Sequence, residues 1–223
     1  MPAARPVFDW RARFQVWGCY GDLRLDGRDW PARSRLEIFS HDLSPQAAID
    51  GRPDLVAVMM NPGGSRPLEP ADARGWAPAQ PDRTQLQLMK LAERVGSAIP
   101  GVAPVQHIRV LNLSDLRTPQ SAELFGWLAG LQDGRHSLFD PARACEREHL
   151  LGSKTTPVLR AWGLGKALGG LARQAVRATE GRRLLGLSDD GLLYRHPLPQ
   201  HAQRQREWLD AVLEQWRELP TRP

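Results

Sequence analysis

The spacing of apolar residues predicts alternating strands and helices over most of the chain. Residues 55–60 form a continuous apolar run, which is typical of a strand buried on both faces of a sheet. Residues 84–95 instead place apolar side chains at the spacing of an amphipathic helix. Together with N-cap and proline signals, the same criteria predict further strands at 107–111, 157–162 and 183–187, and further helices at 118–129, 140–151, 166–179 and 203–219.

Two parts of the chain are less regular. Residues 14–20 and 35–40 have the alternation expected of short strands. We therefore divide the chain into an N-terminal extension, residues 1–50, whose short strands pack on the core, and a single globular α/β domain, residues 51–223. Residues 62–81 contain five prolines, and we expect them to form an ordered but irregular loop.

The order of these elements predicts a fold class and the place of a site. Strands that alternate with helices of ten or more residues imply a three-layer α/β/α fold with a mainly parallel central sheet. In such sheets, ligands bind outside the carboxyl ends of the strands. The segments at these ends are Asn61-Pro62-Gly63-Gly64, Asn112 to Asp115, Trp162-Gly163 and Tyr194 to Pro197.

Composition and charge narrow the classes of function. The chain has 223 residues, of which 41% are hydrophobic and 25% charged, enough for one domain with a core. Its formal net charge is +5, and only three of its 30 basic residues are lysines. The planar guanidinium of arginine suits phosphate, so a polyanionic partner is one interpretation. The arginine bias of a GC-rich genome is the other.

Several classes are excluded. The longest apolar run is far shorter than the roughly 20 residues of a membrane helix, and no signal-peptide core follows residues 1–6. We therefore expect a cytoplasmic protein without membrane contact, and a monomer. The two cysteines, Cys19 and Cys145, are too few for a disulfide framework, a four-thiolate zinc site or a four-cysteine iron–sulfur site. The histidines lack metal-ligand spacing, so we predict no metal and no cofactor.

Three side chains at the strand ends have suitable chemistry for a site. Asn61 and Asn112 follow apolar strands, and an asparagine amide can hold a water or read the edge of a base, because it offers a donor and an acceptor. A turn or cap role is the alternative for both. Pro197 holds His196 in an extended conformation. This histidine can donate to a developing anion, or it can be purely structural.

Two glycine-containing segments raise the question of nucleotide binding. Residues 152–156 resemble the end of a P-loop, but they precede a strand instead of following one, which excludes that assignment. Gly163 and Gly165 lie between a predicted strand and a helix. Leu168 occupies the third glycine position of the dinucleotide fingerprint. A nucleotide-binding enzyme using Gly163 and Gly165 therefore stays as an alternative.

The order of the motifs resembles that of the uracil-DNA glycosylase superfamily over residues 54–216. Met60-Asn61-Pro62-Gly63 resembles the first motif of its mismatch-specific branch, and Val110-Leu111-Asn112 resembles the strand that supplies the base-reading asparagine. His196-Pro197-Leu198-Pro199 is similar to the late His-Pro-Ser-Pro loop. The chain is also similar to an uncharacterised bacterial family with Asn-Pro, Asn-Leu, Trp-Gly and His-Pro-Leu motifs.

This resemblance implies a uracil-DNA-glycosylase-like fold and a monofunctional DNA glycosylase that leaves an abasic site. The target would be a flipped-out uracil-like or 5-modified pyrimidine in double- or single-stranded DNA. The catalytic residues implied are Asn61, which positions the attacking water, and His196, which donates to the leaving base. The substrate-binding residues implied are Met60, Pro62, Gly63, Gly64 and Asn112, with Trp76 of the proline-rich loop as a candidate stacking lid. A core position is the alternative for Trp76.

The resemblance also implies a DNA-binding surface and a substrate preference. Phosphates would be held by Lys166, Arg195, Arg204 and Arg206, and Leu198 would act as a wedge in the base stack. Gly63 and Gly64 stand where uracil-selective members place a tyrosine, so the pocket is expected to admit pyrimidines enlarged at C5, such as those of modified phage DNA. A defence role would follow. A non-enzymatic nucleic-acid-binding protein on the same fold is the alternative.

Overall fold

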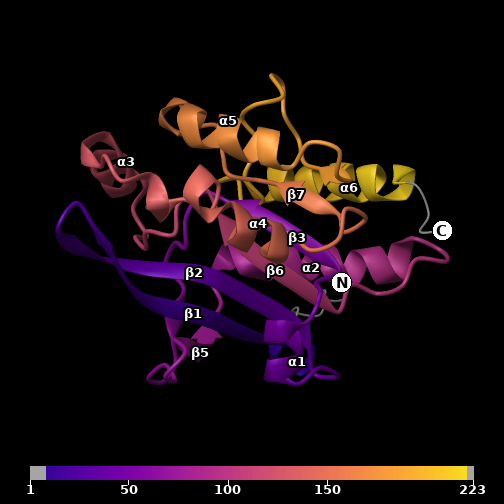
Figure 1. The fold of residues 1–223 in the computed structure, drawn as a ribbon. Coiled ribbons are helices and arrows are strands. Elements are labelled where there is room, and N and C mark those ends of the chain that lie inside the picture. The colour runs from indigo at the N-terminus through magenta and orange to yellow at the C-terminus, as the bar shows by residue number, and fades with distance from the viewer. Residues whose placement is uncertain (1–8, 220–223) are drawn as a thin grey trace.

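The computed structural model describes residues 9–219, which form an α/β fold around one eight-stranded sheet (Figure 1). The start of the chain discussed above, residues 1–6, lies outside the described residues. The sheet order is β4-β5-β1-β2-β6-β3-β7-β8. The strands are β1 (Phe14–Leu25), β2 (Arg28–Ser40), β3 (Leu55–Met59), β4 (Arg66–Pro67), β5 (Trp76–Gln80), β6 (His107–Asn112), β7 (Val158–Arg160) and β8 (Leu184–Leu185).

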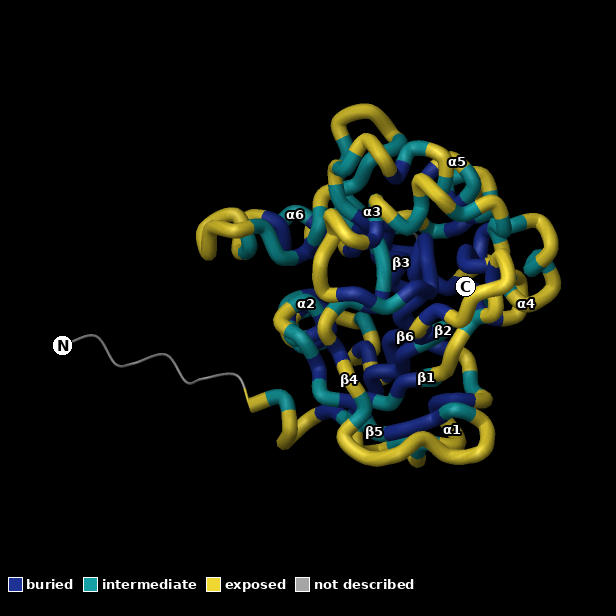
Figure 2. Tube along the Cα trace, turned by 90° about the vertical axis from the view of Figure 1, so that its left-hand side faces the viewer, coloured by how far each residue is buried: buried dark blue, intermediate teal, exposed yellow. Residues whose placement is uncertain are grey.

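The helices lie on both faces of this sheet. They are α1 (Pro45–Asp50), α2 (Arg83–Ala98), α3 (Ser121–Gly130), α4 (Ala144–Leu150), α5 (Gly169–Ala178) and α6 (Ala202–Glu218). Apolar residues of α2 and α6 form one core with the first face of the sheet, and residues of α4 and α5 form a second core with the other face. Figure 2 shows β3 and β6 buried between exposed segments. None of the helices in the described part of the chain is both long and apolar enough to cross a membrane.

The sheet is mixed, and the expectation of a mainly parallel sheet is wrong. Strands β6, β3, β7 and β8 are joined by parallel pairs, whereas β4, β5, β1, β2 and β6 are joined by antiparallel pairs, so β6 is parallel to β3 and antiparallel to β2. The antiparallel half exists because β1 and β2 form a long hairpin. Its two-residue turn, Asp26-Gly27, has positive φ angles of 48° and 76°, the conformation that this kind of tight hairpin requires.

The hairpin is longer than the sequence pattern predicts. The predicted strands at 14–20 and 35–40 are confirmed as the ends nearest the core, but pairing continues through Leu25 and Arg28. Strand β2 also pairs with β6 over Leu36 to Phe39. Residues 14–40 therefore form part of the central sheet.

The proline-rich segment also contributes to the sheet. Residues 62–81 were expected to be irregular, but they contain β4 and β5, which extend the sheet beyond β1. Strand β5 pairs with β1 through Trp76, Ala77 and Pro78. Proline is tolerated here because these are short strands at an edge, where a missing N–H breaks few ladder bonds.

Candidate active site

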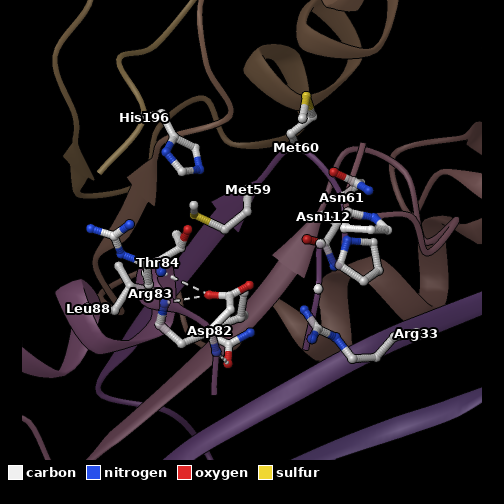
Figure 3. Close-up of a pocket in the computed structure, with 16 residues that line it drawn as sticks. Arg33, Met59, Met60, Asn61, Asp82, Arg83, Thr84, Leu88, Asn112 and His196 are labelled. Atoms are coloured by element: carbon white, nitrogen blue, oxygen red, sulfur yellow. Dashed lines mark hydrogen bonds between the residues drawn. The ribbon is translucent and has the colours of Figure 1, made fainter. Parts of the chain in front are cut away.

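A cavity of about 330 Å³ lies at the carboxyl ends of β3 and β6 (Figure 3). It brings together seven residues that the sequence predicts for a site: Met60, Asn61, Pro62, Gly63, Gly64, Asn112 and His196. The chain has only two asparagines, and both line this cavity. The segments that follow β3 and β6, and the segment around His196, therefore meet at one cavity, as the rule for the ends of parallel strands predicts.

Pairing between β3 and β6 fixes the two asparagine segments against each other. Met59 is in register with Asn112. Beyond the strands, the Leu113 amide donates to the Met59 carbonyl at 2.8 Å, and the Ser114 amide donates to the Met60 carbonyl at 3.1 Å. The segment that carries Asn61 is thus held rigidly beside the one that carries Asn112.

The amide of Asn61 has a fixed orientation. Its Nδ2 donates to the Thr118 carbonyl at 2.8 Å and to the Leu116 carbonyl at 3.3 Å. Because Nδ2 is held by these two carbonyls, the side chain has Oδ1 left as a hydrogen-bond acceptor. Figure 3 shows this oxygen on the cavity side of the amide. Asn61 is therefore suited to accept a hydrogen bond from a water or a ligand.

Asn112 is fully buried and lacks partners. Its exposure is 0%, and neither Nδ2 nor Oδ1 makes a hydrogen bond within the protein. A buried polar group left unsatisfied costs about 1–3 kcal/mol, so folded proteins rarely retain one without a reason. A ligand in the cavity that offers an acceptor beside a donor would satisfy both atoms.

His196 enters the cavity from the loop between β8 and α6. Burial lowers the pKa of its imidazole, which favours the neutral ring. The Leu198 amide donates to Nδ1 at 3.2 Å. In a neutral ring whose Nδ1 accepts a hydrogen bond, the proton is on Nε2. The side chain therefore presents a neutral N–H donor.

Two charged residues of the cavity were missed by the sequence reasoning. Arg33, from β2, is only 1% exposed, and burial lowers the pKa of its guanidinium. Asp82 caps α2, where its Oδ1 accepts from the amides of Thr84 at 2.9 Å and Gln85 at 3.0 Å. The Asp82 signal was available in the sequence, because Asp82 and Gln85 have the spacing of a capping box.

The two glycines have different reasons to be glycine. Gly63 has a φ of +64°, and an added Cβ would lie 3.1 Å from the Asp82 Oδ2. At Gly64, the nearest atom to an added Cβ is the Pro119 Cβ, at 3.8 Å. The backbone favours glycine at the first position, whereas at the second an added Cβ would make only an ordinary van der Waals contact with Pro119.

A second cavity, of about 690 Å³, shares His196 with the first. Its wall includes Arg195, Arg204 and Gly163, three residues singled out from the sequence. Arg195 also pairs with Asp189 at 2.9 Å on the surface. Two predicted phosphate ligands, Lys166 and Arg206, are exposed and line neither cavity, and neither does the half-buried Leu198.

Trp76 does not lie at the site. Of the two roles left open for it, stacking lid and core residue, the structure shows the second: Trp76 is a buried residue of β5, 4% exposed. The Arg35 guanidinium lies 4.6 Å from its ring centroid. It lines neither of the two cavities described above. A ring enclosed in this way packs within the fold and has no free face for a base.

Within residues 9–219, no group of three or more histidine, cysteine, aspartate or glutamate side chains is arranged to hold a metal ion. Comparison of the chain with protein-family models, with curated proteins and with solved structures finds no match.

Proposed function

We propose that this protein is a DNA glycosylase that hydrolyses the N-glycosidic bond of a uracil-like or 5-modified pyrimidine turned out of the strand. The observation that carries this proposal is the buried, unpartnered amide of Asn112, in one cavity with Asn61 and His196. A pyrimidine edge presents a carbonyl oxygen beside a ring or exocyclic nitrogen. Such an edge satisfies both the donor and the acceptor of the amide.

The proposed reaction divides the work among three side chains. The bond between C1′ and the base nitrogen breaks, and its electron pair stays on the base. The Nε2–H of His196 donates to the base as negative charge develops. The Oδ1 of Asn61 positions a water whose oxygen bonds to C1′, and the proton of that water ends on the released base. An abasic site remains.

The glycines support a preference for larger pyrimidines. Gly63 and Gly64 both line the cavity, and neither places a side chain in its wall. A substituent at C5 of the base therefore meets no large side chain from these two positions. Modified phage DNA contains pyrimidines that are enlarged at C5. An enzyme that removes them would have a defence role.

The second cavity supports a DNA-binding role for its arginines. Arg195 and Arg204 line it, and it adjoins the first cavity at His196. Phosphates that flank a flipped nucleotide would meet these guanidinium groups, and the exposed Lys166 and Arg206 would extend the contact. These contacts position the strand without reading its sequence.

The test is mass spectrometry of free bases released from cellular and phage DNAs. We expect wild type to release a pyrimidine and Asn61→Ala to lose that release while still retaining DNA in a binding assay. Gln46→Ala is the matched control, because it removes an exposed amide in α1. We expect this variant to behave as wild type.

Each other result has a defined meaning. DNA retention without any base release by wild type would support the non-enzymatic binder. Stabilisation of the protein by a dinucleotide, with none by DNA, would support the nucleotide-binding alternative at Gly163 and Gly165. Full activity of Asn61→Ala would remove Asn61 from the mechanism.

A further inference from the structure

We propose that Arg33 is a further catalytic residue, whose guanidinium contacts the departing base and balances its negative charge. This inference rests on the proposed glycosylase function. It adds to that function a cation that the motifs do not contain, supplied by the N-terminal hairpin. Figure 3 shows the guanidinium reaching the cavity from the side of β2, below Asn112.

A β-bulge directs this side chain into the cavity. Cys19 pairs with Arg35 and Tyr20 pairs with Arg33, so Ser34 is an extra residue in β2. Consecutive residues of β1 point to opposite faces of the sheet, and their partners do the same. Arg33 therefore lies on the face opposite Arg35, although the two are only two positions apart.

The contacts of the two arginines agree with this assignment. Arg35 approaches Glu37 at 3.3 Å and lies over the Trp76 ring. Arg33 instead lines the cavity together with Val110 and Asn112. In a regular strand without this bulge, residues 33 and 35 would share a face, and Arg33 would point away from the cavity as Arg35 does.

Arg33 has only part of the compensation that a buried cation needs. Its Nε and Nη1 atoms have no hydrogen-bond partner, and among the described residues it forms no ion pair. Burial lowers its pKa and outweighs Tyr20 and Asp82, which favour its charged form. Arg109, equally buried, donates from Nε to Glu37 at 2.7 Å and from Nη2 to the Gly51 carbonyl at 3.0 Å. The fold thus satisfies Arg109 more fully than Arg33, which lines the cavity with two unpartnered nitrogens.

The other charged groups of the cavity do not remove the need for a partner. Asp82 attracts the Arg33 charge, but it directs Oδ1 to the amides of α2 and forms no ion pair with Arg33 among the described residues. His196 is neutral, as its burial indicates, and Arg83 is exposed. Arg33 is therefore the deeply buried cation among the residues of this cavity.

A departing base supplies the missing counter-charge. Before cleavage the base is neutral, and Arg33 gains only hydrogen bonds from it. After the glycosidic electron pair moves to the base, the guanidinium faces an anion. An interaction that strengthens as the bond breaks lowers the barrier and not only the energy of the bound substrate. Arg33 transfers no proton in this step.

The test compares two leaving groups of nearly equal size. Single-turnover release is measured from DNA oligonucleotides that carry either one uracil or one 5-fluorouracil, whose anion is the weaker base. We expect Arg33→Met to slow uracil release about 100-fold, the scale of losing one preorganised donor to a developing anion. The loss should be smaller for 5-fluorouracil, which needs less stabilisation. Arg33→Lys, which keeps a charge, should recover part of the rate.

Thermal unfolding provides a second readout. Arg33→Met removes an unpartnered buried charge, so its midpoint should equal or exceed that of wild type. Arg109→Met is the matched control: it removes a buried arginine on the other face of the sheet that is fully partnered, and it should lower the midpoint.

The outcomes separate this inference from the function on which it rests. If wild type releases no base, the glycosylase proposal fails and this inference fails with it. If wild type is active and Arg33→Met keeps its rate, or slows both bases equally, only the role of Arg33 is overturned. A fall in the unfolding midpoint of Arg33→Met would instead make Arg33 structural.

Discussion

At the scale of single residues, the cavity contains side chains that the local sequence predicts and one, Arg33, that it does not. Asn61, Asn112 and His196 were predictable, because each follows a strand or precedes a proline, and such positions are visible in the sequence. Arg33 was not. It lies just before the strand predicted at 35–40, in residues expected to be irregular, and the bulge that directs it depends on pairing with β1.

The neutral state of His196 predicts how stability changes with pH. Burial lowers its pKa below the ordinary 6.5, so the unfolded chain takes up a proton at a higher pH than the folded protein does. The contribution of this residue to stability is therefore present above about pH 6.5 and is lost as the pH falls. We expect the free energy of unfolding of wild type to decrease more than that of His196→Gln between about pH 7.5 and pH 5.

Urea unfolding at several pH values measures this difference. Glutamine keeps an N–H donor but does not titrate, and other titrating groups, such as His136 and Asp115, are common to both proteins. Their contributions cancel in the comparison. Parallel pH profiles for the two proteins would show that His196 has no lowered pKa.

At the scale of elements, local patterns predict well and long-range pairing does not. The helices α2 and α6 and the strands β3 and β6 are confirmed close to their predicted bounds, because each has its periodicity within its own sequence. The full hairpin and β5 were missed. Their polar and proline residues are acceptable in strands only because of partners elsewhere in the chain, which no local pattern contains.

A buried charge cluster joins the hairpin to the parallel half of the sheet. Glu37 of β2 is fully buried and contacts the Nε of Arg109 at 2.7 Å and the Nε2 of His107 at 2.6 Å, both on β6. Removing one partner of a buried pair leaves an uncompensated charge. We expect Glu37→Gln to lower the free energy of unfolding by about 3–5 kcal/mol, measured by urea denaturation.

An exposed carboxylate provides the control for this prediction. Glu214 pairs with Arg217 on the surface of α6. Exposed pairs contribute little, so Glu214→Gln should change the free energy of unfolding by less than about 1 kcal/mol. Equal effects of the two substitutions would mean that the cluster does not hold β2 to β6.

At the scale of the whole molecule, the site combines distant parts of the chain. Arg33 comes from the hairpin, the two asparagines from the parallel strands, and His196 from the loop before the last helix. The sequence predicted the last three and a division at residue 50. Residues from before and after residue 50 line the cavity, because β2 pairs with β6 in the middle of the sheet.

This arrangement predicts that residues 51–223 do not fold alone. Their separation from the hairpin would expose one edge of β6 and would remove Leu36, Ile38 and Phe39, all fully buried. Each such side chain contributes about 1.5–3 kcal/mol on burial, and Phe14 and Val16 are lost as well. Five losses of this size are comparable with the whole of the about 5–15 kcal/mol that stabilises a typical domain.

Circular dichroism and urea unfolding of the shortened chain measure this directly. We expect no cooperative transition, because β6 would lose its hydrogen-bonding partner β2 and the core would be exposed to solvent. In the full chain, tryptophans of the hairpin and of α6 should report the same unfolding midpoint, since both belong to one cooperative unit. A cooperative transition of residues 51–223 would show that the hairpin is an independent extension. In that case Arg33 would reach the cavity from a separate unit, and its removal with the hairpin would test its catalytic role without disturbing the rest of the fold.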